Sequence, residues 1–290
     1  MRRLLAATAS LCLVLTAAPP ALADPADPQP QASVGVLDGP ATAWIVADLD
    51  SGEILAGRNE NNRSGPASTI KTLLAQVVVD EVPLDATVVA DAADTRVECN
   101  CAGVAPGQTY TARQLLDGLL LVSGNDAANT LAHLLGGMDA TVAKMIAKAA
   151  ALGATSTRVG SPSGIDGPGI DMWSTPRDMA VIFRGAMGYP VLTEIMAQHS
   201  ATFPAKGGDR VLVNQDEMLA RYPGFLAGKT GYTDLARKTF VGAAARDGRR
   251  LVIAMMYGLV RDGGPSYWDQ ATSLLDWGFA QGQGPGIGTL

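Results

Sequence analysis

The sequence predicts an α+β protein with one antiparallel sheet assembled from both ends of the chain. Apolar runs bounded by turn residues, typical of strands, occur near the start and in the last third, whereas the middle repeats its apolar residues at helical spacing. The 290 residues are 47% hydrophobic, which is enough for one large core and too apolar for a disordered protein. We therefore expect terminal helices to cover the sheet and an all-helical subdomain to lie beside it.

The start of the chain is typical of an export signal. Arg2 and Arg3 precede an apolar run, Leu4–Ala18, and Ala21-Leu22-Ala23 forms a small-x-small cleavage site. We predict that residues 1–23 are a signal peptide. The mature protein would then be secreted, in the periplasm or the cell wall.

The rest of the chain shows no change of composition that would mark a second domain. Residues 24–40 form a Pro-rich polar leader, residues 41–280 one domain, and residues 281–290 a Gly-rich flexible tail. Later apolar runs are shorter than the ~20 residues that span a bilayer. We therefore expect no membrane anchor.

The strands of the sheet follow from short apolar runs beside turn residues. Near the start, Ala43–Asp48 is followed by a turn at residues 50–52 and a return strand, Glu53–Ala56. Near the end, Asp247-Gly248 is a strong hairpin signal. The strands expected there are Leu226–Thr233, Thr239–Arg246 and Leu251–Met256.

The helices follow from apolar residues that recur every three to four positions and from residues that cap helix ends. The first has Ile70, Leu73, Leu74, Val77 and Val78 on one face. The predicted helices begin at Ser68, at the capping box of Thr111 and Gln114, after Asn125 (ending at Gly136-Gly137), at Met138 (ending at Leu152), at Thr175-Pro176, and at Ser266 (ending near Ala280).

Charge and histidine content exclude several classes of function. A formal net charge of −6 gives no electrostatic reason to bind nucleic acid or an anionic membrane surface. The two histidines, His133 and His199, are too few for a multi-His zinc site and leave little for a Ser-His-Asp triad. We expect no metal and no cofactor.

Two cysteines, Cys99 and Cys101, remain once the signal peptide has carried away Cys12. Export favours a disulfide, but an i,i+2 pair in an extended chain lies near the upper limit of bridgeable Cα distance, roughly 7 Å. A positive φ at Asn100 would bend the chain enough. A local bridge and two half-buried free thiols both remain open, and neither makes these residues catalytic.

Three short motifs carry candidate chemistry. Ser68 and Lys71 lie one helical turn apart, so a lysine that has lost its proton can serve as the base for a serine nucleophile. A lone Ser-x-x-Lys is expected roughly once by chance in a chain of this length. Here it is followed by Ser123-Gly124-Asn125 between two predicted helices and by Lys229-Thr230-Gly231 within a predicted strand. The order and the placement together indicate one active site.

These motifs resemble those of class A β-lactamases and penicillin-binding proteins. The chain is most similar to the low-molecular-mass D-alanyl-D-alanine carboxypeptidases, the S11 serine peptidases, and among them to secreted actinobacterial members. The likeness spans roughly Ala41 to Ala280 and includes Pro66-Ala67-Ser68, Ser123–Ala127, Gly164-Ile165-Asp166, Ser174–Ala180 and Leu274–Phe279. It implies the penicilloyl-serine transferase fold. It also implies removal of the terminal D-alanine from peptidoglycan stem pentapeptides during cell wall maturation, and β-lactam antibiotics as covalent inhibitors.

The resemblance also implies a role for each motif residue. Ser68 would be the nucleophile, Lys71 its base and Ser123 the relay of a proton to the leaving amine. Asn125 would bind the substrate's peptide carbonyl, Lys229 and Thr230 its terminal carboxylate, and the N–H groups of Ser68 and Tyr232, just after Gly231, would form the oxyanion hole. From the residues themselves, a charge on Lys229 near Lys71 would lower the pKa of the Lys71 amine, as a lysine base requires.

Three alternatives stay open. A β-lactamase of the same fold would carry a Glu-x-x-Leu-Asn pattern and usually an aspartate where Gly124 stands, and this chain has neither. A non-catalytic module that binds penicillin or senses the wall would not need all three motifs intact. The balance between carboxypeptidase activity and transpeptidase or endopeptidase activity depends on cleft shape.

Some relatives add an arginine near the closing helix that helps to bind the substrate carboxylate. Here Tyr267 stands near that position and Arg261 lies earlier, so we assign this role to no residue.

Overall fold

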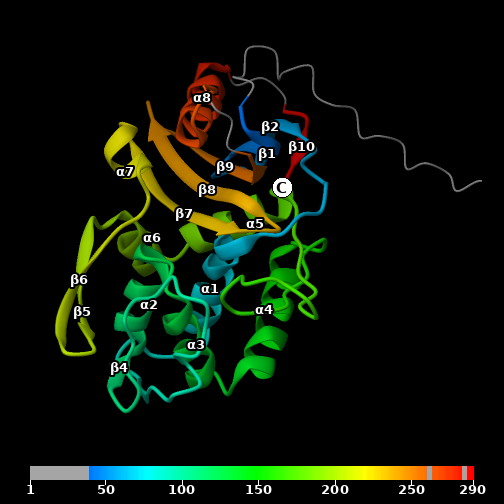
Figure 1. Cartoon of the computed structure of the whole chain (residues 1–290). Coiled ribbons are helices and arrows are strands. Elements are labelled where there is room, and N and C mark those ends of the chain that lie inside the picture. Colours follow the sequence, from blue (N-terminus) through cyan, green and yellow to red (C-terminus); the bar gives the residue numbers. More distant parts are fainter. Residues whose placement is uncertain (1–38, 260–262, 283–285) are drawn as a thin grey trace, which may run out of the picture.

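The protein is described by a computed structural model over residues 39–259, 263–282 and 286–290 (Figure 1). The predicted signal peptide and nearly all of the predicted leader lie outside these residues. Among the described residues, no helix has both the length and the apolar character needed to cross a membrane.

A six-stranded antiparallel sheet forms the centre of the molecule, in the order β10-β2-β1-β9-β8-β7. β1 pairs with β9, so the two ends of the chain meet in the middle of the sheet as predicted. The turn at Asp247-Gly248 joins β8 to β9, with positive φ at both residues. The strands are β1 Ala41–Asp48, β2 Glu53–Arg58, β7 Phe225–Thr233, β8 Arg237–Arg246, β9 Arg249–Gly258 and β10 Gly288–Thr289.

β10 falls in the segment that the sequence predicts as a flexible tail. Gly288 and Thr289 pair with β2, and Leu290 N–H donates to the carbonyl of Gly52. A strand of two residues in a Gly-rich segment shows no alternation, so the sequence carries no signal for this pairing.

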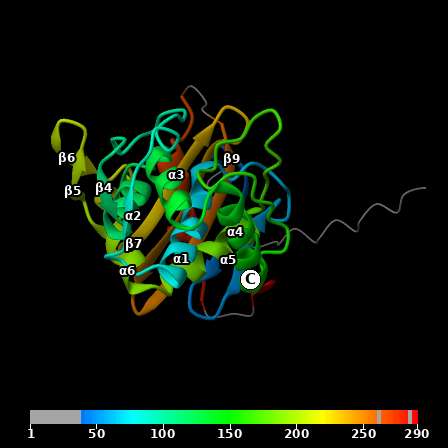
Figure 2. The same cartoon turned by 90° about the horizontal axis from the view of Figure 1, so that it is seen from below.

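Helices cover both faces of the sheet. α8 (Tyr267–Ala280) packs on one face against β1 and β9, and α5 (Pro176–Met187) packs on the opposite face, with α1 (Lys71–Glu81) against α5 (Figures 1 and 2). The prediction that terminal helices cover the sheet is confirmed for α8. The other face is covered instead by α1 and α5, which come from inside the chain.

The predicted helical subdomain lies beside the sheet and also carries two small hairpins. Three of its helices start and stop close to where the sequence places them: Thr111 and Gln114 form the capping box of α2, and Gly153 ends α4 with a positive φ. The helices at 190–197 and 218–221 were not predicted. The remaining elements are α2 Ala112–Leu121, α3 Asn125–Leu134, α4 Met138–Leu152, α6 Pro190–Ala197, α7 Met218–Arg221, and the hairpins β3 Thr87–Val89 with β4 Thr109–Thr111 and β5 Ser200–Ala205 with β6 Gly208–Val213.

Candidate active site

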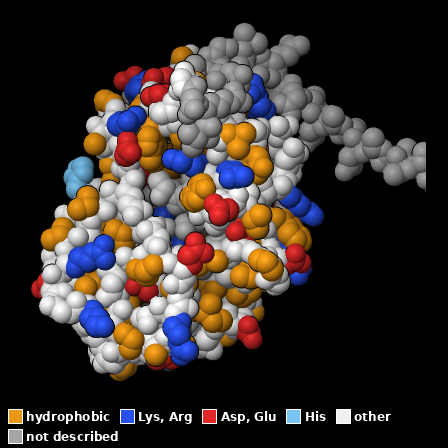
Figure 3. All heavy atoms as spheres, viewed as in Figure 1, with side chains coloured by type: hydrophobic (Ala, Val, Ile, Leu, Met, Phe, Trp, Pro, Cys, Tyr) orange, Lys and Arg blue, Asp and Glu red, His pale blue; other side chains and the backbone are white. Residues whose placement is uncertain are grey.

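A cleft of about 700 Å³ opens between the edge strand β7 and the helical subdomain. All three sequence motifs meet there, although they come from three separate parts of the chain. On the face of the molecule in Figure 3, charged side chains of both signs are interspersed with apolar ones. The predicted site residues that line the cleft are Ser68, Ser123, Asn125, Thr230, Gly231 and Tyr232.

Ser68 lies at the start of a helix that the sequence places correctly but describes too simply. Ala67–Ile70 is a turn of 3₁₀ helix that leads into α1, and Ala67 itself has a φ of 48°. Gly164 lies against this turn, and a Cβ on it would come within 2.1 Å of the Ala67 carbonyl oxygen. The close approach holds the Ser68 turn in place and leaves its side chain half-buried at the cleft.

Lys71 is fully buried directly beneath Ser68. Its Nζ lies 2.7 Å from Ser68 Oγ and 2.8 Å from Asn125 Oδ1, and it also donates to the carbonyl of Ser163. A neutral amine has two N–H groups, which the oxygens of Asn125 and Ser163 can accept, and one lone pair, which then faces Ser68 Oγ. The geometry fits a base that takes the Ser68 proton.

The environment of Lys71 favours that neutral form. Burial lowers its pKa well below the usual range, Lys229 lowers it further, and Asp126 opposes both. The expected influence of Lys229 is confirmed, but loss of solvent is the larger cause. An amine with a lowered pKa can accept a proton near neutral pH.

Asn125 is fixed from three sides at the start of α3. Its Oδ1 accepts from Lys71, its Nδ2 donates to the Glu98 carbonyl at 2.7 Å, and its backbone N–H donates to the Asn100 carbonyl at 2.7 Å. The loop that supplies these carbonyls is closed by a Cys99–Cys101 disulfide with a Cα separation of 5.0 Å. Of the two alternatives, the bridge is present, and it forms without a positive φ at Asn100.

Asp126, to which we assigned no role from the sequence, anchors the end of the same loop. Its carboxylate accepts the backbone N–H groups of Ala102, Gly103 and Val104 at 2.9 Å each. This carboxylate ties the loop after the disulfide to the start of α3. These hydrogen bonds fix the Ser-x-Asn motif relative to the loop at 98–104. The aspartate directly after the motif was the feature of the sequence that could have predicted this anchor.

Ser123 is held in a strained conformation at the cleft. Its φ is 59°, a region that costs a non-glycine residue about 1–3 kcal/mol, and its side chain is only 2% exposed. Its Oγ has no hydrogen-bond partner among the described residues. A buried hydroxyl without a partner at the edge of a cleft is available to a substrate.

Lys229 and Gly231 shape the β7 side of the cleft. Lys229 is buried, and its Nζ donates to the Thr230 carbonyl at 2.7 Å. Burial lowers the pKa of Lys229 to about 7, and Asp216 opposes this shift. A Cβ on Gly231 would lie 2.8 Å from the backbone nitrogen of Ser68, so glycine lets β7 pass directly beside the Ser68 backbone.

The comparisons with known proteins agree with this geometry. Residues 30–258 match the S11 peptidase family, described as D-alanyl-D-alanine carboxypeptidase. D-alanyl-D-alanine carboxypeptidase DacB2 of Mycobacterium tuberculosis is 65% identical over the full length of both chains. The chain belongs to the S11 family. DacF of Bacillus subtilis, with the same activity in its name, is 28% identical over 97% of this chain and 72% of its own.

Solved structures place this S11 chain in the fold of penicillin-binding DD-peptidases. A crystal structure of D-alanyl-D-alanine carboxypeptidase from M. tuberculosis H37Rv is 67% identical, with a TM-score of 0.88 over 90% of this chain and 99% of that chain. The Streptomyces K15 DD-transpeptidase is 28% identical, with a TM-score of 0.75 over 84% and 98% of the two chains. The fold that the resemblance implied is confirmed.

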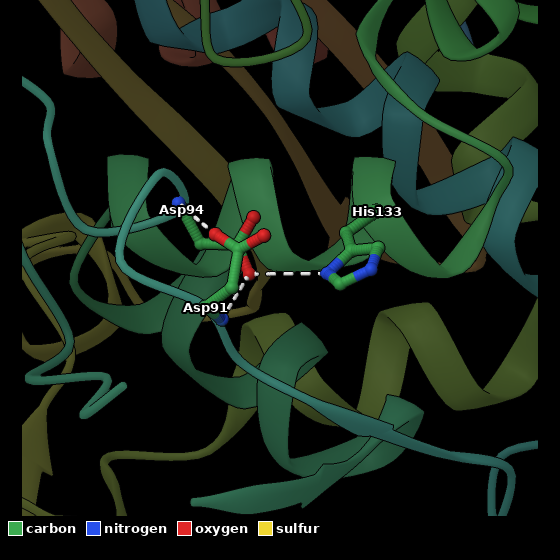
Figure 4. A group of neighbouring side chains, drawn as sticks. All are labelled: Asp91, Asp94 and His133. Atoms are coloured by element: carbon green, nitrogen blue, oxygen red, sulfur yellow. Dashed lines mark hydrogen bonds and ion pairs between the residues drawn. The ribbon is translucent and has the colours of Figure 1, made fainter. Parts of the chain in front are cut away.

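A second group of titratable side chains, Asp91, Asp94 and His133, lies away from the cleft of this S11 chain (Figure 4). Asp91 Oδ1 accepts the N–H groups of Ala93 and Asp94. Asp94 Oδ2 accepts the N–H of Asp91 and lies 3.3 Å from His133 Nδ1. The carboxylates thus close a turn after β3, and this structural role accounts for the grouping.

Proposed function

We propose that the protein is a serine-type D-Ala-D-Ala carboxypeptidase that removes the terminal D-alanine from peptidoglycan stem pentapeptides. The observation that carries this proposal is the contact between Ser68 Oγ and the fully buried Lys71 Nζ, at 2.7 Å. The S11 family match over residues 30–258 supports the substrate class.

In the proposed acylation, Ser68 Oγ attacks the carbonyl of the penultimate D-alanine while Lys71 takes the hydroxyl proton. The developing oxyanion would be bound by the backbone N–H groups of Ser68 and Tyr232. The C–N bond then breaks: Ser123 gives its proton to the departing amine and takes up the proton that Lys71 holds, so Lys71 is neutral again. D-Alanine leaves, and the shortened peptide remains as an ester on Ser68.

In the proposed deacylation, water enters the half of the cleft that D-alanine has left. Lys71 takes a proton from that water as it attacks the ester, and the proton returns to Ser68 Oγ when the ester bond breaks. The tetrapeptide is released and the enzyme returns to its starting state.

Substrate binding would use the remaining motif residues. Asn125, fixed by the bridged loop, presents its amide to the peptide carbonyl of the substrate, and Thr230 presents its hydroxyl to the terminal carboxylate. Lys229 supplies positive charge to the same carboxylate. Peptidoglycan lies outside the cytoplasm, which fits the predicted signal peptide at residues 1–23 and a role in cell wall maturation and cell shape.

A DD-transpeptidase is the second candidate because the Streptomyces K15 DD-transpeptidase shares this fold at a TM-score of 0.75. Both activities form the same acyl-enzyme and differ in whether water or an amine attacks it. Addition of an acceptor amine to the peptide assay distinguishes them, since a transpeptidase gives a new peptide bond in place of free tetrapeptide.

The decisive experiment is incubation with N-acyl-L-Lys-D-Ala-D-Ala and, separately, with penicillin. We expect release of D-alanine and a covalent penicillin adduct on Ser68 by mass spectrometry, and both should disappear in Ser68→Ala. An adduct on any other serine would overturn the assignment. A protein that labels but never releases D-alanine would instead be a penicillin-binding module.

The lifetime of the penicillin adduct separates a carboxypeptidase from a β-lactamase. Hydrolysis of a penicilloyl ester needs a base on the face that the bulky ring leaves open, and the sequence lacks the lactamase glutamate motif. We expect the adduct to decay over minutes to hours while the peptide turns over quickly. Penicillin turnover faster than peptide turnover would identify a β-lactamase.

A further inference from the structure

Behind the cleft, an acidic side chain lies buried against the strand that carries Lys229. Asp216 is only 5% exposed, and its Oδ2 has no hydrogen-bond partner among the described residues. A Cβ on Gly228 would come within 2.2 Å of this oxygen, so the carboxylate lies directly against β7 at the residue before Lys229. A buried carboxylate oxygen without a hydrogen-bond partner lowers the stability of the fold, so its presence needs an explanation.

The position of Asp216 is fixed by its neighbours. Its N–H donates to Asn214 Oδ1 at 2.9 Å, and its Oδ1 accepts the N–H of Met218 at the start of α7. Asn214 Nδ2 in turn donates to the carbonyls of Met196 and Gln198. These hydrogen bonds fix residues 214–218 and hold one carboxylate oxygen of Asp216 against β7.

Strand geometry places Asp216 and the Lys229 ammonium on opposite sides of β7. Successive side chains of a strand point to opposite faces, so the face that would hold a residue 228 side chain is not the face of Lys229. Phe225 lies on the Asp216 side, and its ring stacks on Phe240 in the layer beneath α8. The carboxylate thus approaches Lys229 from an apolar layer, where water does not screen it.

We propose that Asp216 is a positioning residue that maintains the charge of Lys229 from behind the strand, so that the ammonium can bind the substrate's terminal carboxylate. This rests on the proposed function. Two further charged groups are linked to this pair: Glu217 acts on Asp216, and Lys229 acts on Lys71, which Asp126 also influences. Within the described residues, Asp216 is the anion that opposes the loss of the Lys229 proton.

The titration of the two groups supports this assignment. Burial raises the pKa of Asp216 to about 7, with Lys229 lowering it and Glu217 raising it. Burial lowers the pKa of Lys229 to about 7, with Asp216 raising it. Without the Asp216 carboxylate, the Lys229 ammonium would lose its proton at a lower pH. The affinity for an anionic substrate would then fall at that lower pH.

The test compares the pH profile of kcat/KM for D-alanine release in wild type, Asp216→Asn and Glu217→Gln. Asn keeps the size of Asp and removes its charge. We expect the alkaline limb of Asp216→Asn to move about one unit to lower pH, which lowers kcat/KM about tenfold at pH 8. At pH 6 Lys229 is charged in wild type and about half charged in the variant, so kcat/KM should stay within about twofold there, and the acid limb should not move.

Glu217→Gln is the matched control because it removes the same charge one residue away. Glu217 is exposed and pairs with Arg221 at 3.0 Å, and we expect an unshifted profile. An equal loss for Asp216→Asn at every pH would show a merely structural role, and an unchanged profile would also overturn the proposal. Thermal unfolding and stoichiometric penicillin labelling confirm that each variant is folded.

Penicillin also carries a carboxylate, so the pH profile of Ser68 acylation gives a second readout that does not depend on peptide turnover. We expect the same shift of the alkaline limb in Asp216→Asn. If wild type labels but releases no D-alanine, the proposed function fails, and the labelling profile still decides the role of Asp216.

Discussion

Lys71 and Lys229 are both buried in one cleft, yet their surroundings differ. Lys71 contacts the neutral oxygens of Ser68, Asn125 and Ser163, and burial with a nearby ammonium lowers its pKa. Lys229 contacts the Thr230 carbonyl and has a buried carboxylate behind its strand. The nearby charges differ in sign: the Lys229 ammonium favours the neutral form of Lys71, whereas the Asp216 carboxylate favours the charged form of Lys229.

The difference shows how one residue type can serve opposite purposes a short distance apart. Desolvation acts on both amines in the same direction, so the choice between base and cation depends on the charges that remain nearby. The same charge on Lys229 that attracts a substrate carboxylate helps to keep Lys71 unprotonated. The proposed roles of the two lysines are therefore coupled.

The largest effect should come from Lys71→Arg, which keeps a positive charge but cannot act as a base. Arginine stays protonated in proteins, so we expect acylation to fall by about 10²–10⁴-fold, as in Lys71→Ala. The rate of penicillin labelling measures this. A folded Lys71→Arg that acylates within about threefold of wild type would show that another group is the base.

Lys229→Arg should behave in the opposite way, because Lys229 needs only its charge. Loss of a charge-assisted hydrogen bond is worth about 1.5–3 kcal/mol, so Lys229→Ala should raise KM for the acidic peptide roughly 10- to 150-fold. Lys229→Arg should retain more affinity than Lys229→Ala. A C-terminally amidated peptide, which lacks the carboxylate, should not distinguish Lys229→Ala from wild type, and a preference there would contradict the role.

The pH dependence of kcat/KM should report both lysines. Activity rises with pH as Lys71 loses its proton, and it falls about tenfold per unit above pH 7 as Lys229, with a pKa of about 7, loses its own. A bound carboxylate favours the ammonium, so the alkaline limb of kcat should lie at higher pH than that of kcat/KM. Coincident limbs would mean that Lys229 does not contact the substrate anion.

The smallest effect should come from opening the disulfide. Cys99→Ser with Cys101→Ser loosens the loop whose carbonyls hold Asn125, at about 0.5–1.5 kcal/mol per hydrogen bond. We expect kcat/KM to fall about 2- to 13-fold with the labelled serine unchanged. Cys12 lies in the predicted signal peptide, so we expect no other cysteine in the mature protein to form a replacement disulfide. A loss as large as that of Lys71→Ala would assign the bridge a catalytic role.

The features that sequence predicted well are those written in local patterns. The capping box of Thr111 and Gln114, the turn at Asp247-Gly248 and the spacing of Ser68 and Lys71 each depend on a few adjacent residues. Because such patterns fix their own geometry, the helix ends, the hairpin and the contact between Ser68 and Lys71 could be predicted without knowledge of the fold.

The features that sequence missed depend on contacts between distant segments. The Ser163 carbonyl reaches Lys71 only because Gly164 packs on the Ser68 turn, and Asp216 reaches β7 only through the chain that follows β6. A hydrogen bond to a backbone carbonyl does not depend on residue type, so the sequence cannot predict it. An Asp in a loop is common in surface turns, so the sequence did not single out Asp216. The two small hairpins were missed because their short strands lack a clear alternation.

The two edges of the sheet differ in what lies beside them. β7 borders the cleft, so its outer edge is where an extended peptide could lie. At the other edge, β10 lies over β2, and Arg177 donates to the Thr289 carbonyl. Unpaired strand edges invite pairing with other chains. The pairing of residues 288–289 covers part of the β2 edge, so we expect a protein shortened before residue 286 to form oligomers more readily on concentration.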